Sequence, residues 1–199
     1  EVSLLELTGA YATFANGGRG VAPYVITRIR TAGGKVLYAR KDAGRTQVVD
    51  PRSVAMMNAM MTETLRSGTA RKADLPGWPA AGKTGTSQDF RDAWFIGYTA
   101  HLVTGVWFGN DDNSPTRKAT GGGLPVEVWS RVMRAAHQGV AVAALPGIGR
   151  GGIAADGVAA AVASGAAAAA ERAPLTRAAV RPEADAGLDG WLMQRLFGR

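Results

Sequence analysis

The stretch Gly77–Ser87, GWPAAGKTGTS, holds the residues of this chain that are best suited to chemistry. Lys83 supplies a positive charge, and the hydroxyls of Thr84 and Thr86 can hold a carboxylate. Gly85 has no side chain, so a substrate backbone can come close to it. These residues fit two kinds of site: a G-x-x-x-x-G-K-[ST] phosphate loop, or a strand that binds an extended peptide. One lysine cannot serve both.

The residues around Lys83 argue against a phosphate loop. Such a loop needs a buried strand before its first glycine and a helix that starts at its Lys-Thr pair. Here SGTARKADLP, residues 67–76, is polar and charged, and Pro79 lies inside the loop itself. Poor helix formers follow Thr84. We therefore interpret the match as accidental and predict that ATP and GTP do not bind.

A peptide-binding strand fits the same residues better. The Lys-Thr-Gly-Thr run is followed by a turn and two further runs of strand type, which predicts an antiparallel meander. An edge strand has unpaired N–H and C=O groups, to which an extended peptide can add. The Thr86 N–H could then form half of an oxyanion hole, and Ser87 would adjoin the site. We expect the catalytic groups to be Lys83 and Thr86, and the substrate-binding residues to be Lys83, Thr84, Gly85, Thr86 and Ser87.

The rest of the chain predicts an α+β layout with an antiparallel sheet. A capping box at Ser3 and Glu6 begins a helix that Asn16-Gly17-Gly18 ends. A hairpin over residues 23–40 turns at Gly33-Gly34, and Asp50 with Pro51 begins a second helix. Three strands, residues 80–87, 92–100 and 101–110, precede a last helix over 124–138.

The chain changes character at Gly139. An Ala/Gly-rich tail, residues 139–199, lacks lysine and has few aromatics. It holds too little apolar surface to offset the entropy of ordering, so we predict that 140–186 are mostly disordered. A short helix over 188–197 is expected near the end, where Trp191–Phe197 could dock to a protein partner or a membrane surface.

Composition narrows the classes of function. The 199 residues suffice for one ordinary domain, cysteine is absent, and no apolar run approaches the roughly 20 residues of a membrane span. The chain does not begin with Met, and we interpret it as a piece of a longer polypeptide. The net charge of +7 is spread along the sequence, which argues against nucleic-acid binding and suits an envelope protein that faces acidic polymers.

No cofactor or metal site is expected, because the Asn110–Asn113 run lacks calcium-loop spacing. His101 and His137 are not expected to form a catalytic pair.

Three long blocks carry a resemblance to a known family. They are SLLELTGAYATFANGGRGVAPYVITRI, AAGKTGTSQDFRDAWFIGYTAHLVTGVWFGNDDNSP and TGGGLPVEVWSRVM. Together they resemble the transpeptidase domain of class A penicillin-binding proteins, the bifunctional peptidoglycan synthases, over residues 1–138. The resemblance implies a five-stranded antiparallel sheet packed by helices, with the Lys83 strand at one edge and the 23–40 hairpin at the opposite edge.

The activity that the resemblance implies is DD-transpeptidation. In it a serine attacks the penultimate D-Ala of a peptidoglycan stem peptide, and the acyl group passes to the amine of a neighbouring stem. β-Lactams acylate the same serine. The resemblance also implies a location on the periplasmic side of the bacterial inner membrane, fusion to a glycosyltransferase, and a membrane anchor outside this chain.

The sequence departs from the family pattern in one respect. The family places Ser-x-x-Lys and Ser-x-Asn elements before Lys-Thr-Gly, and neither occurs in the chain. We expect the nucleophile to lie in the upstream half of the same domain, and the isolated fragment to be inactive. Two alternatives stay open: a β-lactamase or DD-carboxypeptidase relative, and a non-catalytic envelope interaction module.

Overall fold

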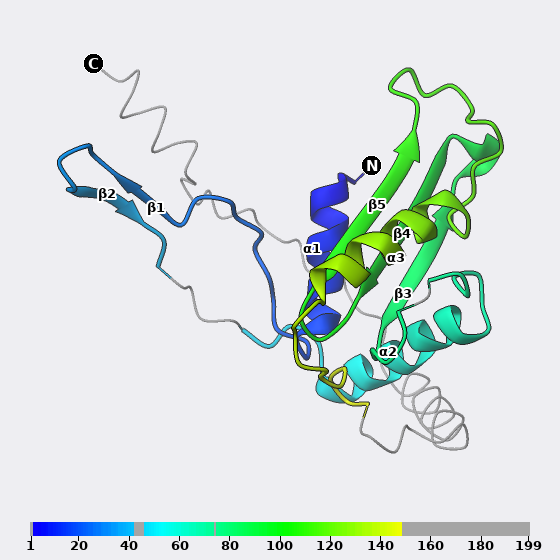
Figure 1. Cartoon of the computed structure of the whole chain (residues 1–199), viewed down its shortest axis with the longest axis horizontal. Helices are drawn as coiled ribbons and strands as arrows, with labels where there is room; N and C mark the ends of the chain where they lie inside the picture. Colours follow the sequence, from blue (N-terminus) through cyan, green and yellow to red (C-terminus); the bar gives the residue numbers. More distant parts are fainter. Residues whose placement is uncertain (1, 42–45, 74, 149–199) are drawn as a thin grey trace, which may run out of the picture. The chain divides into compact units, whose positions relative to one another are not determined.

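A computed structural model describes residues 2–41, 46–73 and 75–148 of the chain (Figure 1). The elements, in chain order, are α1 (Leu4–Ala15), β1 (Arg28–Arg30), β2 (Val36–Ala39), α2 (Pro51–Arg66), β3 (Ala81–Thr86), the 3₁₀ turn η1 (Gln88–Phe90), β4 (Asp92–Tyr98), β5 (Val103–Gly109) and α3 (Leu124–Ala136). This order confirms the predicted α+β class with antiparallel strands. The predicted 188–197 helix and the Trp191–Phe197 docking segment lie outside the described residues.

The two predicted helix starts are confirmed. At α1, Ser3 and Glu6 form a capping box in which the Ser3 N–H donates to the Glu6 carboxylate over 2.8 Å. The same contacts lower the pKa of the Glu6 carboxyl, chiefly through the Ser3 hydroxyl. At α2, the Asp50 carboxylate accepts from the backbone N–H of Arg52, and Pro51 occupies the first turn. Local sequence therefore fixes both helix starts.

The strands divide between two sheets, not one. Strands β3, β4 and β5 form an antiparallel meander, and β1 pairs with β2 in a separate two-stranded sheet. The expected edge position of β3 is confirmed within the described residues, but the expectation of the hairpin at the opposite edge of one five-stranded sheet is wrong. The physical reason is that β1 and β2 span only three and four residues, pair with each other, and keep their side chains mostly exposed, so they do not pack into the central sheet.

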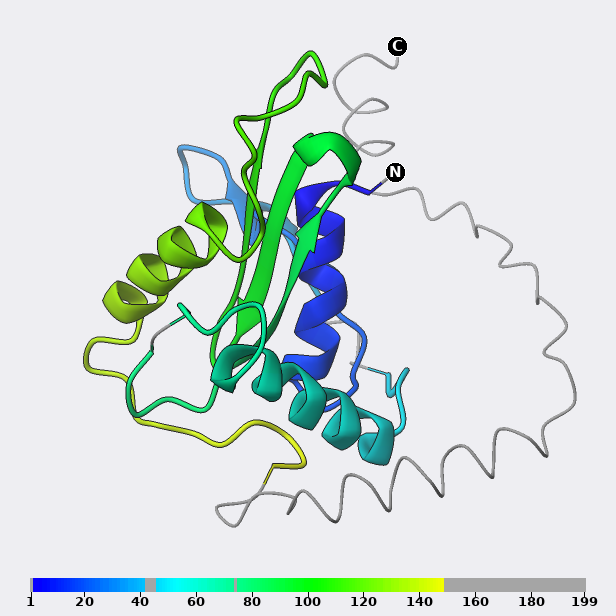
Figure 2. The same cartoon turned by 90° about the vertical axis from the view of Figure 1, so that its right-hand side faces the viewer.

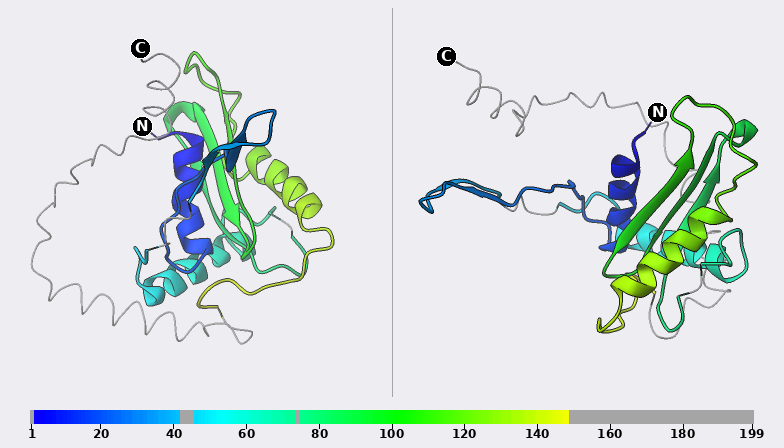
Figure 3. Two further views of the ribbon diagram at one scale, coloured as in Figure 1. Left: turned by 90° about the vertical axis from the view of Figure 1, so that its left-hand side faces the viewer. Right: turned by 45° about the horizontal axis from the view of Figure 1, so that its top comes forward.

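Helices cover both faces of the three-stranded sheet, with α1 and α3 on opposite faces (Figure 2). Adjacent residues of β4 show this division, because neighbouring strand side chains point to opposite faces. Gly97 lies against the Trp129 ring of α3, while Ile96 pairs with Gly105, which lies against Leu4 of α1. The α2 helix contacts β3, the edge strand, and runs across the end of the sheet in the views of Figure 3.

Two clusters of buried side chains hold these layers together. Beneath α3, Trp129 is fully buried, stacks edge-on against Phe95 at 5.2 Å between ring centroids, and donates its indole N–H to the Gly97 carbonyl. Between α1, α2 and β4, the buried Tyr98 hydroxyl donates to Asn58 over 2.6 Å. Burial also raises the pKa of the Tyr98 phenol. The buried Trp129 indole and Tyr98 hydroxyl therefore both have partners, which offset their desolvation.

The chain keeps packing beyond the boundary that the sequence suggests. Leu145 is buried in the cluster with Tyr98, and the carbonyl of Pro146 accepts from the Asn58 amide over 2.9 Å. Residues 145–148 therefore belong to the packed unit, although they fall in the segment predicted to be disordered. The burial of Leu145 and the hydrogen bond from Asn58 of α2 hold this segment in place. The remainder of that prediction, for residues 149–186, lies outside the described residues.

Replacing Gly97 with Ala tests the close contact between β4 and α3. A Cβ at Gly97 would lie 2.7 Å from the Trp129 ring and 2.8 Å from the Phe95 ring. We expect Gly97→Ala to lower the free energy of unfolding by about 1–3 kcal/mol, measured by urea titration, because overpacking a core displaces its neighbours. Gly33→Ala is the control, since nothing lies closer than 3.9 Å to that position. Equal stability of the two variants would contradict this packing.

Candidate functional site

The pairing of β3 with β4 decides which backbone groups face outward. The Ser87 N–H donates to the Asp92 carbonyl over 3.0 Å. Hydrogen-bonded pairs alternate with open pairs in antiparallel strands, so the next bonded pairs are Gly85 with Trp94 and Lys83 with Ile96. The N–H and C=O groups of Thr84 and Thr86 therefore point away from β4, along the edge of the sheet.

Only part of that edge is covered by the described residues. The Thr64 hydroxyl, at the end of α2, donates to the outward Gly82 carbonyl over 2.5 Å. The Lys83 ammonium donates to the outward Thr84 carbonyl over 2.8 Å. No backbone partner for the Thr84 or Thr86 N–H occurs in the described part of the chain. The edge is thus capped at Gly82 and open from Thr84 to Thr86.

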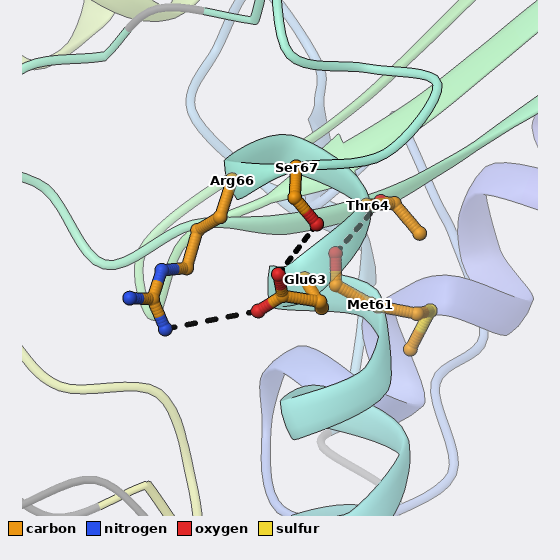
Figure 4. Close-up of polar contacts among 5 residues, drawn as sticks. All are labelled: Met61, Glu63, Thr64, Arg66 and Ser67. Atoms are coloured by element: carbon orange, nitrogen blue, oxygen red, sulfur yellow. Dashed lines mark hydrogen bonds and ion pairs between the residues drawn. The ribbon is translucent and has the colours of Figure 1, made fainter. Parts of the chain in front are cut away.

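The end of α2 that caps this edge is itself fixed by local contacts (Figure 4). The Ser67 hydroxyl donates to the Glu63 carboxylate over 2.6 Å, and Arg66 pairs with the same carboxylate at 3.7 Å. The Thr64 hydroxyl also contacts the Met61 carbonyl at 2.8 Å. These contacts hold the last helical turn where Thr64 meets β3.

The side chains of the Lys-Thr-Gly-Thr run divide between the two faces of the sheet. Strand alternation directs Lys83 to the face covered by α1, where it lines a groove of about 790 Å³. The groove is mostly apolar; its walls include Leu4, Tyr11, Trp94 and Trp107. Lys83 and Asp92 are the two charged residues among the described residues that line the groove. The groove can receive an apolar segment beside a fixed positive charge.

Thr84 and Thr86 point to the other face, where they line a pocket of about 370 Å³ together with Thr69, Arg71 and Lys72. The hydroxyls of Thr69 and Thr84 share a hydrogen bond of 2.6 Å. Lys72 also pairs with Glu127 at 3.7 Å. This pocket therefore combines hydroxyl donors with two cations, a set that suits an anionic group.

A turn that contains Gly121 and Gly122 lies against Thr86 and Gly85 of β3 and against Thr69. The Gly121 N–H donates to the Thr86 hydroxyl over 3.0 Å. A Cβ at Gly121 would lie 2.5 Å from the Gly85 carbonyl oxygen, and one at Gly122 would lie 2.5 Å from the Thr69 carbonyl oxygen. Only glycine fits this approach of the turn to β3. The Thr86 hydroxyl accepts from Gly121, so its own proton is available to a ligand.

Ser87 is committed to the turn that follows β3. Its hydroxyl accepts from the Asp92 N–H over 2.7 Å, and its backbone N–H also bonds to Asp92. The Asp92 carboxylate accepts in turn from the Trp107 indole over 2.8 Å. The structure therefore brings Lys83, Gly85 and the two threonines to one strand edge, and places Ser87 beside them as a turn residue.

Other polar residues singled out in the sequence have structural partners. His137 is buried and bonds through its two ring nitrogens to Thr99 and to the Met133 carbonyl, both at 2.8 Å. The His101 ring lies 6.4 Å from the His137 ring, and Trp78 contacts both. The structure brings the two histidines together as parts of a packed cluster, in which the Thr99 hydroxyl bonded to His137 is itself fully buried.

The Asn110–Asn113 segment forms a turn, as the sequence indicates. The Asp112 carboxylate accepts from the Ser114 N–H over 3.0 Å, and the same residue lowers the pKa of that carboxyl. Across the described ranges, no group of three or more His, Asp or Glu residues is placed to hold a metal ion. In the same ranges, no helix has the length and apolar character needed to span a bilayer.

Sequence reasoning missed Thr69 and gave Gly121 and Gly122 no role at the site. Thr69 lies 15 positions before Thr84 in a polar turn, and nothing in SGTARKADLP distinguishes its hydroxyl from its neighbours. The glycines were visible as a run, but their contact partners on β3 and after α2 are set by tertiary packing. Only the fold shows that these two turns meet at β3.

A comparison with family models assigns the chain to a class of protein. Residues 1–134 match the penicillin-binding protein transpeptidase domain. The chain therefore belongs to this family, as its sequence blocks indicate.

Individual relatives specify the kind of penicillin-binding protein. Over 147 residues the chain is 40% identical to penicillin-binding protein 1A of Neisseria lactamica, which covers 70% of this chain and 18% of that protein. Over 133 residues it is 34% identical to penicillin-binding protein 4 of Bacillus subtilis, which covers 67% of this chain and 21% of that protein. The chain thus spans about a fifth of the length of these relatives, and the 1A relatives support class A membership.

Solved structures agree with this assignment. The penicillin-binding protein PonA1 of Mycobacterium tuberculosis matches with a TM-score of 0.65 and 30% identity, over 72% of this chain and 40% of that one. A second PonA1 structure, in complex with penicillin V, matches equally well in TM-score at 29% identity. Penicillin-binding protein 1A of Haemophilus influenzae, at 23% identity and a TM-score of 0.62, shares the fold.

Replacing Thr69 with Val tests whether the turn after α2 holds Thr84. Valine keeps the shape and removes the hydroxyl, so we expect Thr69→Val to lower the free energy of unfolding by about 0.5–1 kcal/mol. The control is Thr62→Val, because the buried Thr62 hydroxyl has no hydrogen-bond partner in the described structure. That variant should be neutral or slightly stabilised in the same urea titration. A destabilisation of Thr62→Val as large as that of Thr69→Val would contradict the assigned contact.

Proposed function

We propose that this chain is the C-terminal part of a peptidoglycan DD-transpeptidase that works through a serine acyl-enzyme. Its membership of the penicillin-binding transpeptidase family supports the class of reaction. The observation that carries the proposal is the β3 edge, open from Thr84 to Thr86 and flanked by Lys83. The substrate would be a stem peptide laid along this edge, and a β-lactam would occupy the same place.

Each residue of the edge has a role in the proposed reaction. The outward amide of Thr86 would donate to the oxyanion formed as the nucleophile attacks. The hydroxyls of Thr84 and Thr86 would hold the terminal carboxylate, the latter with the proton that its bond from Gly121 leaves available. Gly85 allows the substrate backbone to approach, and Lys83 supplies positive charge beside it.

The nucleophile comes from outside this chain in our proposal. Ser87 is engaged in the β3–β4 turn and has no lysine three positions after it. A general base within hydrogen-bond reach is needed to activate a serine. We infer that the upstream half of the same domain supplies the Ser-x-x-Lys and Ser-x-Asn elements. We propose that this upstream half packs into the apolar groove beside Lys83, whose walls include Trp94 and Trp107.

The proposed setting follows from the relatives. We propose that the parent protein is a class A synthase with a fused glycosyltransferase, that it acts on the periplasmic side of the bacterial inner membrane, and that its anchor lies outside this chain. We propose residues 1–138 as the transpeptidase part, with the 145–148 segment packed onto it. An upstream Ser-x-x-Lys in the parent distinguishes this enzyme from a non-catalytic interaction module. An upstream glycosyltransferase region distinguishes it from a β-lactamase or carboxypeptidase.

A phosphate loop is the function that this geometry disfavours. Lys83 and Thr84 lie within strand β3, whereas a phosphate loop needs them at the start of a helix. The amides that would meet a nucleotide's phosphates are therefore not gathered around Lys83.

Lys83→Ala in the full-length protein tests the role of the β3 edge. We expect acylation by a fluorescent penicillin to slow on the order of a hundredfold or more, because one lost charge contact at a reacting site costs about 2.7–4 kcal/mol. The control is Arg131→Ala, which removes an equal charge from an exposed position on α3. A folded Lys83→Ala protein with an unchanged acylation rate would rule out the assignment.

The chain of 199 residues alone should not react with penicillin. It holds one part of the proposed site and no activated serine, so we expect no covalent adduct at concentrations that label the full-length protein completely. Intact-mass spectrometry of both proteins after the same exposure makes the comparison. A stoichiometric adduct on a serine of this chain would show that the nucleophile is not upstream.

A further inference from the structure

The segment from Arg19 to Lys41, which contains the β1–β2 hairpin, carries an unusual concentration of positive charge. Residues 19–41 contain six basic residues and no acidic residue. The basic residues are Arg19, Arg28, Arg30, Lys35, Arg40 and Lys41. None of the ion pairs found among the described residues involves this segment. Within the described residues this positive charge is therefore not neutralised by an ion pair, and it favours an anionic partner.

Two of these arginines frame a pocket. The pocket has a volume of about 360 Å³ and is lined by Tyr24, Thr27, Arg28, Ala39 and Arg40. The guanidinium of Arg40 lies 3.9 Å from the centre of the Tyr24 ring, which fixes its plane. Guanidinium groups match the geometry of an oxyanion with two parallel hydrogen bonds, and the Thr27 hydroxyl adds a further donor.

The hairpin also offers strand edges and apolar contacts. Strands of three and four residues pair only with each other in a two-stranded sheet, so each has an edge without a strand partner in the described residues. Val25 is 94% exposed, and Val36 and Leu37 are each 48% exposed. An isolated two-stranded hairpin is marginal in water, and a third strand would stabilise it.

We propose that this hairpin is a docking site for an extended acidic peptide, with a carboxylate of that peptide seated between Arg28 and Arg40. Such a peptide uses all three features: its backbone pairs with a free strand edge, its carboxylates meet the arginines, and its apolar side chains cover the exposed valines. An anionic lipid surface would use the charge and the apolar groups but not the strand edges. The site is independent of the β3 edge and does not depend on the transpeptidase assignment.

Fluorescence anisotropy of the whole 199-residue chain with a labelled eight-residue peptide of alternating Val and Glu tests the proposal. We expect the peptide to bind, and the Arg28→Gln/Arg40→Gln variant to bind it at least tenfold more weakly. The matched control is Arg52→Gln/Arg131→Gln, which removes the same charge from exposed positions on α2 and α3 and should bind within twofold of the unchanged chain. Equal weakening of both variants, or no binding by the unchanged chain, would overturn the proposal.

Amide hydrogen exchange provides a readout that long-range attraction does not change. Bound peptide should slow exchange at the backbone amides of β1 or β2, because a paired edge is protected. Free Arg28→Gln/Arg40→Gln protein should show the same hairpin exchange as the unchanged chain, which would separate lost binding from a lost fold. Binding without protection of the hairpin, or tighter binding to phosphatidylglycerol vesicles than to the peptide, would overturn the docking mode.

Discussion

Two turns fix the threonine side chains of β3, while the outward N–H groups of Thr84 and Thr86 have no backbone partner in the described residues. The packing of the other elements maintains this edge. Thr69 and Gly121 contact the hydroxyls of Thr84 and Thr86 from turns that follow α2 and precede α3. Thr64 closes the edge at Gly82. A strand fixed in this way presents its outward amides without further reorganisation, which is what electrostatic stabilisation of a reacting carbonyl requires.

The packing of the helices explains why this edge can be both rigid and exposed. Trp129 joins α3 to β4 through the Gly97 carbonyl, and Tyr98 joins β4 to α2 through Asn58. The meander is therefore braced at its central strand, so β3 needs no outer neighbour to keep its position. Lys83 and the two threonines lie on opposite faces of the sheet and approach a common ligand only along the open edge. In the proposed reaction, the nucleophile would meet them there.

Sequence patterns predicted the features that depend on neighbouring residues. The capping box of Ser3 and Glu6 and the Asp50 cap are local, and the structure contains both of them. The Lys-Thr-Gly-Thr run could be placed on a strand because the residues around it argue against a phosphate loop, and the resemblance to the family supplied the edge position of that strand. Composition also suggested a change near Gly139, and the burial of Leu145 shows that packing extends beyond that position.

Features that depend on distant contacts could not be predicted in this way. The division of five strands between two sheets depends on which strands pair, and the periodicity of strands as short as β1 and β2 does not reveal their partners. The support of Thr84 by Thr69 joins turns with no sequence signal of their own. Resemblance to the family supplied the sheet as a whole, and its expectation for the hairpin was the part that failed.

A crystal structure of the full-length protein acylated by penicillin tests the central claim most directly. We predict that the β-lactam lies along β3, that its carboxylate is within hydrogen-bond distance of the Thr84 or Thr86 hydroxyl, and that its acyl oxygen accepts from the Thr86 N–H. The acylated serine should belong to the part of the domain upstream of this chain. An acyl group attached to a serine of this chain, or a ligand that does not contact β3, would contradict the claim.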